Sequence, residues 1–132
     1  MKPVTVQATF HGTFDAAVAA VTTALAAAGF GILTEIDVSA TFAKKLGVRF
    51  RPYRILGACN PDLAHRALSL RLDIGALLPC NVAIHERDDG NCEIDAVDPE
   101  VTIGRVGGEL GQLAAEVRAR LVGALEAASK AA

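Results

Sequence analysis

The run of residues 50–61, FRPYRILGACNP, constrains the fold more than any other part of the chain. Its aromatic and branched side chains favour a β-strand, which we place at 48–56. Gly57 is small enough to let the backbone bend or to let another segment approach closely. Asn60 suits a helix N-cap, and Pro61 suits the first helical position, where no amide hydrogen is missed. The run therefore predicts a strand, a sharp turn and a helix that begins at Pro61.

The rest of the chain alternates between the period of a strand and the period of a helix. The turn-forming residues at 88–91 predict that the two strands beside them form a hairpin, so the sheet is not purely parallel. We expect strands at 4–10, 31–38, 48–56, 80–87 and 92–98, and helices at 13–28 (N-cap Thr13), 40–46 (N-cap Ser39), 61–72 and 108–128. The predicted fold class is α+β: a two-layer sandwich with a mixed or mostly antiparallel sheet of about five strands and helices packed on one face.

Length and composition indicate one folded domain that spans residues 1–132. No linker or repeat divides the 132 residues, and a chain of this length can bury a substantial core. A hydrophobic fraction of 52% excludes a disordered chain. The formal net charge is −2 and the basic residues are scattered, so we expect no nucleic-acid partner.

The sequence also predicts where the protein resides. Residues 1–5 lack the apolar region of a signal peptide, and the longest apolar-rich run, 16–30, is too short to span a bilayer. The three cysteines form no C-x-x-C pair, and any single disulfide would leave one thiol over. We therefore expect a soluble protein of the reducing cytoplasm, with no membrane partner.

Two Cys-Asn steps, at Cys59-Asn60 and Cys80-Asn81, lie at predicted element boundaries. Cys59 precedes a helix N-terminus, where the helix dipole lowers the pKa of a thiol and favours the thiolate. If the two strands are neighbours, the thiols lie close together and suit reversible redox chemistry, thiol catalysis or a soft-metal site. The favoured interpretation is that Cys59 is a small apolar residue packed behind the turn.

The histidines add little to a metal site. His65 lies one turn into the helix that begins at Pro61. It joins Cys59 and Cys80 as a third metal ligand only if the geometry allows it. Because no standard ligand spacing is present, we expect no metal, and these three residues form the less favoured alternative. His11 lies at a turn and His85 on the outward face of its strand, so each is assigned a surface or structural role.

Two basic residues and an aromatic one precede the turn, and they allow two interpretations. If the second and third strands are adjacent, Glu35 and Asp37 form cross-strand ion pairs with the arginines, which is the favoured interpretation. Alternatively, the arginines and the tyrosine line a groove for an anionic ligand beside the helix N-terminus. The candidate ligand-binding residues are Arg51, Tyr53, Arg54, Asn60 and Asn81.

The final helix carries a continuous apolar stripe, which is either part of the core or a dimer face. The glycine-rich run 104–108 before it matches neither G-x-G-x-x-G nor a P-loop. We interpret it as a loop that lets the helix pack closely, and phosphate binding is the second choice.

Residues 31–99 resemble the bacterial and archaeal family called domain of unknown function 302, DUF302, over about half of the chain. The match is carried by GILTEID at 31–37, Phe42, KLG at 45–47, YRILGACNP at 53–61, Ala64, LLPCNV at 77–82 and AVDP at 96–99. The resemblance implies a compact α+β domain in a soluble prokaryotic protein, often found alone, that can form dimers. It implies no established activity and no agreed catalytic residues.

We therefore expect a non-enzymatic module that binds a small ligand or assembles with itself. The alternative is a thiol-based redox or soft-metal site that uses Cys59 and Cys80. The expected partners are a homodimer mate and an unidentified small molecule, and no motif predicts a cofactor.

Overall fold

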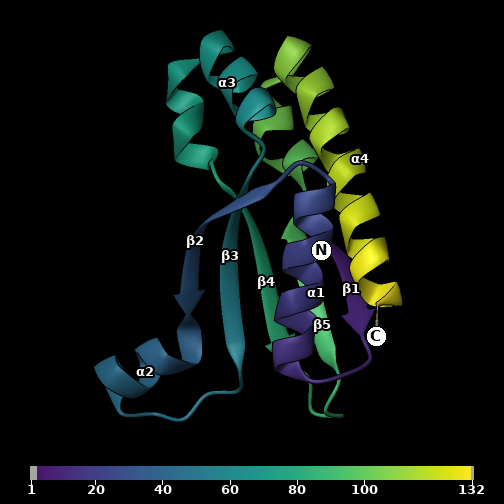
Figure 1. The fold of residues 1–132 in the computed structure, drawn as a ribbon. Coiled ribbons are helices and arrows are strands. Elements are labelled where there is room, and N and C mark those ends of the chain that lie inside the picture. The colour runs from purple at the N-terminus through teal and green to yellow at the C-terminus, as the bar shows by residue number, and fades with distance from the viewer. Residues whose placement is uncertain (1–2, 132) are drawn as a thin grey trace.

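The computed structural model describes residues 3–131 as a five-stranded sheet with helices packed on one side (Figure 1). Met1 and Lys2, on which the expectation about a signal peptide partly depends, and Ala132 lie outside the described residues. The strand order is β1-β5-β4-β3-β2, and every pair of neighbours is antiparallel. The predicted α+β class is confirmed, and the sheet is wholly antiparallel. The strands are β1 (Thr5–Phe10), β2 (Gly31–Asp37), β3 (Tyr53–Cys59), β4 (Cys80–Glu86) and β5 (Cys92–Val97).

Two long helices cover one face of the sheet (Figure 1). They are α1 (Phe14–Ala27), whose N-cap is Thr13 as predicted, and α4 (Gly108–Lys130). The apolar stripe of α4 packs into the core, so it is not a free dimer face. Buried residues of α4 include Leu110, Leu113, Ala114, Val117, Leu121 and Leu125. Burial of such a stripe supplies most of the stability of an amphipathic helix.

The shorter helices lie at the two ends of the sheet (Figure 1). The helix α3 (Pro61–Leu70) begins as predicted, with Asn60 as N-cap, and a 3₁₀ helix, η1 (Leu72–Leu77), follows it. Two further 3₁₀ helices, η2 (Pro99–Val101) and η3 (Ile103–Val106), precede α4. In the part of the chain that the structure describes, no helix is both long and apolar enough to cross a membrane.

The helix α2 (Val38–Leu46) begins earlier than predicted. Its N-cap is Asp37 rather than Ser39, because the Asp37 carboxylate accepts a hydrogen bond from the amide of Ala40 at 2.9 Å. That bond, followed by one from the Ser39 hydroxyl, lowers the pKa of the Asp37 carboxyl group. None of the residues of α2 is fully buried.

The third strand differs from its prediction at both ends. It begins at Tyr53 rather than at residue 48, and it continues through Gly57 to Cys59 without a turn. A Cβ atom at Gly57 would lie 2.8 Å from Cγ of Pro79 and would also collide with Oγ1 of Thr34. The glycine therefore permits a close approach of neighbouring segments and not a bend. The segment before Tyr53 is an exposed loop, and Pro52, which cannot donate a ladder hydrogen bond, accepts one from the amide of Glu86 at 3.0 Å.

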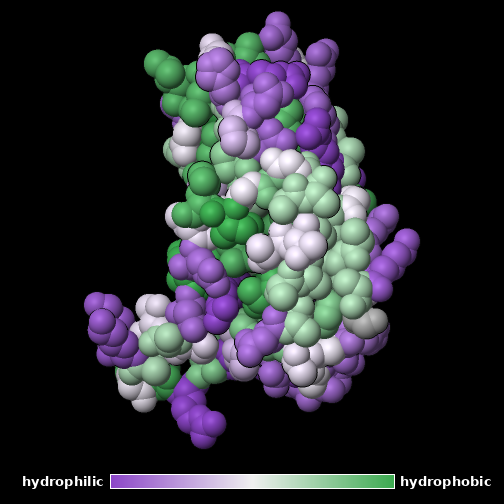
Figure 2. Space-filling model, in the orientation of Figure 1, coloured by the Kyte–Doolittle hydropathy of each residue, from purple (hydrophilic) through white to green (hydrophobic). Residues whose placement is uncertain are grey.

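Side chains alternate between the two faces of the sheet, apart from a register shift between Ile32 and Thr34 of β2. In β4 and β5 the residues that face the helices are buried, among them Val82, Ile84, Ile94 and Ala96. The opposite face carries no helix layer, and its side chains are only partly buried. Figure 2 shows the helix-covered side, where hydrophilic side chains gather over α3 and around α2.

Candidate functional site

The face of the sheet away from α1 and α4 carries two hollows and a group of titratable side chains. A groove of about 680 Å³ runs across β1, β5, β4 and β3 and is bounded by η2 and η3. A second hollow of about 470 Å³ lies between β3 and α2. Tyr53 and Ile55 line both of these spaces, so the two adjoin on the same face of the sheet. We call this surface the open face.

One end of the open face is apolar. Its side chains come from β2, β3, α2 and the loop that precedes β3, and they include Ile36, Val38, Phe42, Phe50 and Ile55. Phe50 packs edge-on against Phe42, with ring centroids 5.1 Å apart. Ile36 and Phe50 nevertheless keep 49% and 46% of their surface exposed. The apolar end is therefore only partly covered by the chain's own residues.

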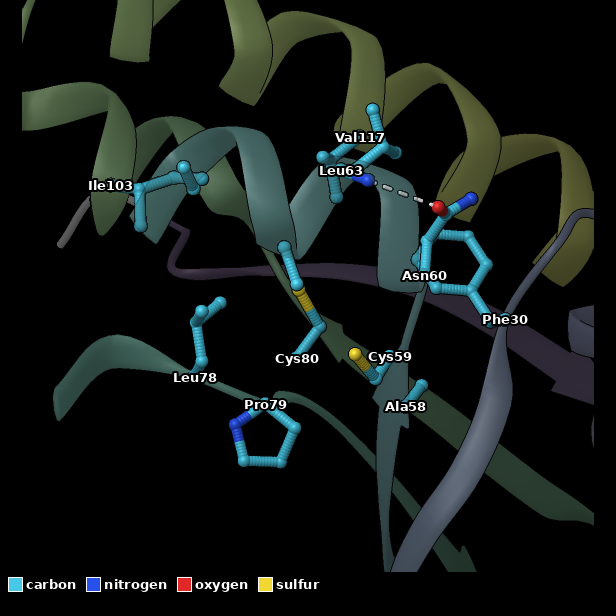
Figure 3. A pocket seen from close by; sticks show the side chains of 12 residues that line it. Phe30, Ala58, Cys59, Asn60, Leu63, Leu78, Pro79, Cys80, Ile103 and Val117 are labelled. Atoms are coloured by element: carbon cyan, nitrogen blue, oxygen red, sulfur yellow. Dashed lines mark hydrogen bonds between the residues drawn. The ribbon is translucent and has the colours of Figure 1, made fainter. Parts of the chain in front are cut away.

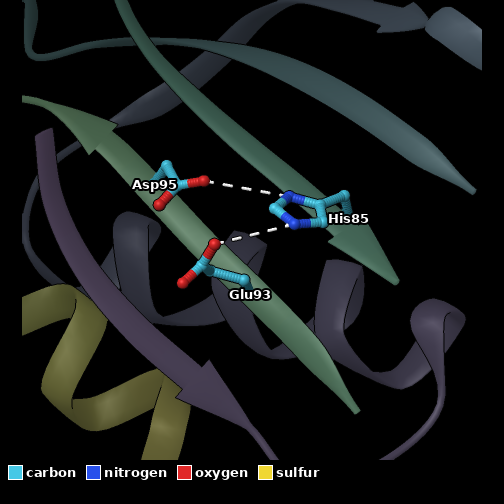
Figure 4. A group of neighbouring side chains, drawn as sticks. All are labelled: His85, Glu93 and Asp95. Carbon is cyan, nitrogen blue, oxygen red and sulfur yellow. Dashed lines mark ion pairs between the residues drawn. The ribbon is translucent and has the colours of Figure 1, made fainter. Parts of the chain in front are cut away.

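The middle of the open face holds a polar cluster of three side chains, His85, Glu93 and Asp95 (Figure 4). Antiparallel pairing sets His85 of β4 directly opposite Glu93 of β5, and Asp95 lies two residues further along β5 on the same face. His85 Nε2 lies 3.6 Å from a Glu93 carboxylate oxygen, and Nδ1 lies 3.8 Å from one of Asp95. Both separations exceed the length of a good hydrogen bond.

Sequence reasoning missed this cluster. It placed His85 on the outward face of its strand, assigned it a surface or structural role, and did not consider Glu93 or Asp95. The available signal was the hairpin: a turn at 88–91 brings β4 and β5 together, and residues two apart in a strand share a face. Only the register, with His85 opposite Glu93, was needed to bring the three side chains together.

The two candidate thiols lie in a different place, beneath α3 (Figure 3). Because β3 and β4 are neighbours and Ala58 pairs with Cys80, the side chains of Cys59 and Cys80 line one cavity. The cavity measures about 30 Å³, space for about one water molecule, and its walls are mostly aliphatic. Burial, and to a lesser degree electrostatic interaction with Cys59, raise the pKa of Cys80 to about 11. Cys80 is therefore a protonated thiol at neutral pH.

Of the other residues in the thiol hypothesis, Asn60 lines the same cavity as the two thiols and His65 does not. Asn60 is buried, and its side-chain oxygen accepts a hydrogen bond from the amide of Leu63 at 3.2 Å (Figure 3). That bond caps α3, which accounts for the buried amide group without a ligand. His65 is exposed on α3 and is not among the residues that line the cavity. The structure therefore does not place His65, the third metal ligand considered, in the cavity of the two thiols.

The five residues considered for an anionic ligand are spread over the molecule. Arg54 projects to the helix-covered face, over the ring of Phe14, and bonds to Glu35 at 3.0 Å and Asp37 at 3.6 Å. The predicted cross-strand ion pairs of Arg54 are therefore present. Arg51 instead pairs with the exposed Asp88 at 3.0 Å.

Of those five, only two line the open-face groove. Tyr53 and Asn81 do so, whereas Asn60 lies at the far end of β3 from Tyr53. The structure thus separates the arginines from the helix N-terminus.

Comparison with known proteins gives a family and a fold. The profile of the family described as "Domain of unknown function DUF302" matches residues 4–128. The crystal structure of the uncharacterized conserved protein DUF302 from Bacillus stearothermophilus is similar, with a TM-score of 0.88 and 26% sequence identity. That similarity covers 96% of this chain and 98% of the other. No curated protein matches the chain.

Proposed function

Because this chain belongs to the DUF302 family, whose description states no activity, we propose a function from geometry: it is a non-enzymatic assembly module. In this proposal the open face pairs with the open face of a second copy, related by a two-fold axis. The observation that carries the proposal is the uncovered apolar end of the open face. An apolar patch that the chain itself leaves open is typical of an interaction surface.

The helix α2 supports a partner on this side of the sheet. A helix of its length is marginal alone and gains its stability by burying an apolar face. Phe42 is only partly covered, by Phe50, and none of the residues of α2 is fully buried. A second copy laid against the open face would cover Phe42 and Phe50 together with the exposed side of Ile36.

The area of the open face supplies a large part of what a stable dimer buries. Five strands about 4.8 Å apart and about 20 Å long span roughly 500 Å² in projection. The side chains that project from the sheet, together with α2, add to that area. A standard interface buries about 800 Å² on each partner. Two sheets packed face to face about 10 Å apart form a common two-layer arrangement.

A small molecule is the other occupant considered for the groove. Its volume of about 680 Å³ lies within the range of small-molecule pockets, which is about 300–1,000 Å³. A small ligand would, however, leave the apolar end beside α2 exposed. We therefore favour the second copy.

The test is the mass of the protein in solution, measured by sedimentation equilibrium. We expect a dimer of 13.7 kDa chains. The variant Ile36→Glu places a charge on the apolar end and is expected to be a folded monomer. The matched control is Leu72→Glu, because Leu72 is 86% exposed and lies on η1, away from the open face. A monomeric wild type, or an Ile36→Glu variant that dimerises like the control, would overturn the proposal.

A thiol pair is the second candidate function, supported by the shared cavity of Cys59 and Cys80. In this alternative the two thiols are oxidised together to a disulfide by an external disulfide, which is itself reduced to two thiols. The test is mass spectrometry of native protein after incubation with oxidised glutathione. A Cys59–Cys80 disulfide that forms without unfolding would support the alternative, and unmodified thiols would oppose it.

All three cysteines are free, which supports a reducing compartment such as the cytoplasm.

A further inference from the structure

The three side chains of the polar cluster have their positions set by backbone pairing, independently of any partner. His85 and Glu93 are direct cross-strand partners, and Asp95 follows Glu93 by two residues on the same face of β5. One nitrogen or oxygen atom of each side chain lies within 4.8 Å of those of the other two. Central strands of a sheet hold such a group more rigidly than a loop would.

The imidazole of His85 has one nitrogen atom with unsatisfied hydrogen bonding. Nδ1 is buried and has no hydrogen-bond partner among residues 3–131, although the carboxylate of Asp95 lies 3.8 Å away. The side chain as a whole is 19% exposed, and both carboxylates face it. Buried polar atoms almost always have a partner, and here Nδ1 faces the Asp95 carboxylate while Nε2 faces that of Glu93, so the group favours an added positive charge.

Two neighbouring side chains orient these groups, as outer-shell residues do around metal ions. Gln7 of β1 donates a hydrogen bond from Nε2 to Oδ1 of Asp95 at 3.0 Å, which leaves Oδ2 directed at His85. The ring of Tyr53 stacks on that of His85, with centroids 5.4 Å apart and planes inclined by 8°. The orientations of Asp95 and His85 are therefore both fixed from outside the cluster.

From this arrangement we propose that His85, Glu93 and Asp95 bind a divalent first-row transition-metal ion. One imidazole nitrogen and two carboxylate oxygens form a donor set that suits Zn²⁺, and three protein ligands leave a position for water. Metal–ligand bonds of about 2.0–2.2 Å require donors closer together than about 4.4 Å. The donor atoms of the three side chains lie within 4.8 Å of one another, so binding an ion requires them to approach by only a few tenths of an ångström.

The proposed ion site is distinct from the two thiols, and it lies on the open face against which a second copy would pack. All three ligands come from one chain, so binding does not require a second copy. Cys59 and Cys80 line another cavity and are not part of the donor set. The alternative is a protonated His85 that forms ion pairs with both carboxylates and binds no metal.

The test is isothermal titration of chelator-treated protein with Zn²⁺ near neutral pH. We expect one ion per chain, and we expect His85→Ala to weaken binding by at least about 10–100-fold, the effect that loss of an outer-shell partner alone can have. Glu93→Gln is a second variant that removes a ligand and nearly preserves shape. The controls are His65→Ala, an exposed histidine on α3, and Cys80→Ser, both expected to bind Zn²⁺ like the wild type.

Each outcome of the titration decides the question. Unsaturable binding, or tight binding retained in both His85→Ala and Glu93→Gln, would overturn the proposed site. Loss of binding in Cys80→Ser would assign the ion to the thiols instead and would also overturn it. Far-ultraviolet circular dichroism of each metal-free variant shows whether it is folded. The Ile36→Glu variant is titrated in parallel, and Zn²⁺ binding by that variant separates the ion site from dimerisation.

Discussion

At the scale of single residues, Asn60 and Cys80 show how the region before α3 is stabilised. Asn60 is a buried polar group that is satisfied within the chain, by the amide of Leu63. Cys80 is a buried thiol in a mostly aliphatic cavity. Both contribute to stability in ways that can be measured without knowledge of a ligand.

Replacing Asn60 by alanine is expected to lower the free energy of unfolding by about 1–2 kcal/mol, because the first turn of α3 loses its cap. Asn60→Ser is the control, since a serine hydroxyl also caps a helix and should recover most of the loss. The measurement is urea unfolding followed by circular dichroism. Equal stability of Asn60→Ala and the wild type would show that the cap contributes nothing.

The Cys80 thiol predicts a loss of stability in alkali. Folding raises its pKa from 9.0 to about 11, so the unfolded chain loses the proton first as the pH rises. The contribution of the thiol is therefore complete below about pH 9 and is lost towards pH 11, by about 2 kcal/mol. Unfolding under reducing conditions at pH 8 and pH 11 measures it. A Cys80→Ala variant should lack this part of the decrease, and an identical decrease in both proteins would contradict the assignment.

Residue-scale prediction from sequence succeeded where the cause is local. The caps at Thr13 and Asn60 follow from short-range chemistry, and both are present. The cap at Asp37 was assigned to Ser39 because two capping residues lie close together, and only the backbone geometry decides between them. The His85 cluster required a strand register, which residue types alone do not specify.

At the scale of elements, β3 shows why the sequence could misplace a strand. A glycine near a strand end favours a turn in isolation, whereas here Gly57 lies within the ladder, opposite Thr34 and Asn81. The reason is steric, because Thr34 and Pro79 occupy the space that a side chain would need. Both neighbours are distant in sequence, so no local pattern predicts this packing.

Gly57→Ala is therefore expected to destabilise the protein by about 1–3 kcal/mol through overpacking between β2 and the start of β4. Adding Thr34→Ala should recover part of the loss, because the two sites are in contact and their effects couple. Gly123→Ala in α4 is the control: no atom lies within 4 Å of its added Cβ, and it should be neutral or slightly stabilising. Thermal unfolding ranks the four proteins, and a Gly57→Ala variant as stable as the control would contradict the steric account.

At the scale of the whole molecule, the sequence predicted the class of fold but not the order of the strands. The hairpin of β4 and β5 is local and was expected. The pairing of β1 with β5 joins Gln7 to Asp95 across most of the chain, and no short-range signal specifies it. That pairing also places Gln7 beside Asp95, one of the ligands of the proposed ion site. The open face thus results from the order of the strands. The family resemblance implied a compact α+β domain and did not specify that order.

Removing metal is expected to weaken dimerisation. In two copies paired through their open faces, Glu93 and Asp95 of each chain lie in the interface, and carboxylates without a counter-charge oppose burial. Sedimentation with Zn²⁺ and with EDTA should therefore give tighter association in Zn²⁺. The double variant Glu93→Gln, Asp95→Asn should be insensitive to EDTA. Equal association of the wild type in both buffers would contradict the link between the ion and the interface.

The most direct measurement of the open face as an assembly surface uses a mixed sample of ¹³C-labelled and unlabelled chains. Isotope-filtered nuclear Overhauser spectra of such a sample report only contacts between copies. We predict intermolecular contacts from the methyl groups of Ile36, Ile55 and Val97, which lie on β2, β3 and β5 of the open face. Contacts confined to α1 or α4, or no intermolecular contacts at all, would contradict the account.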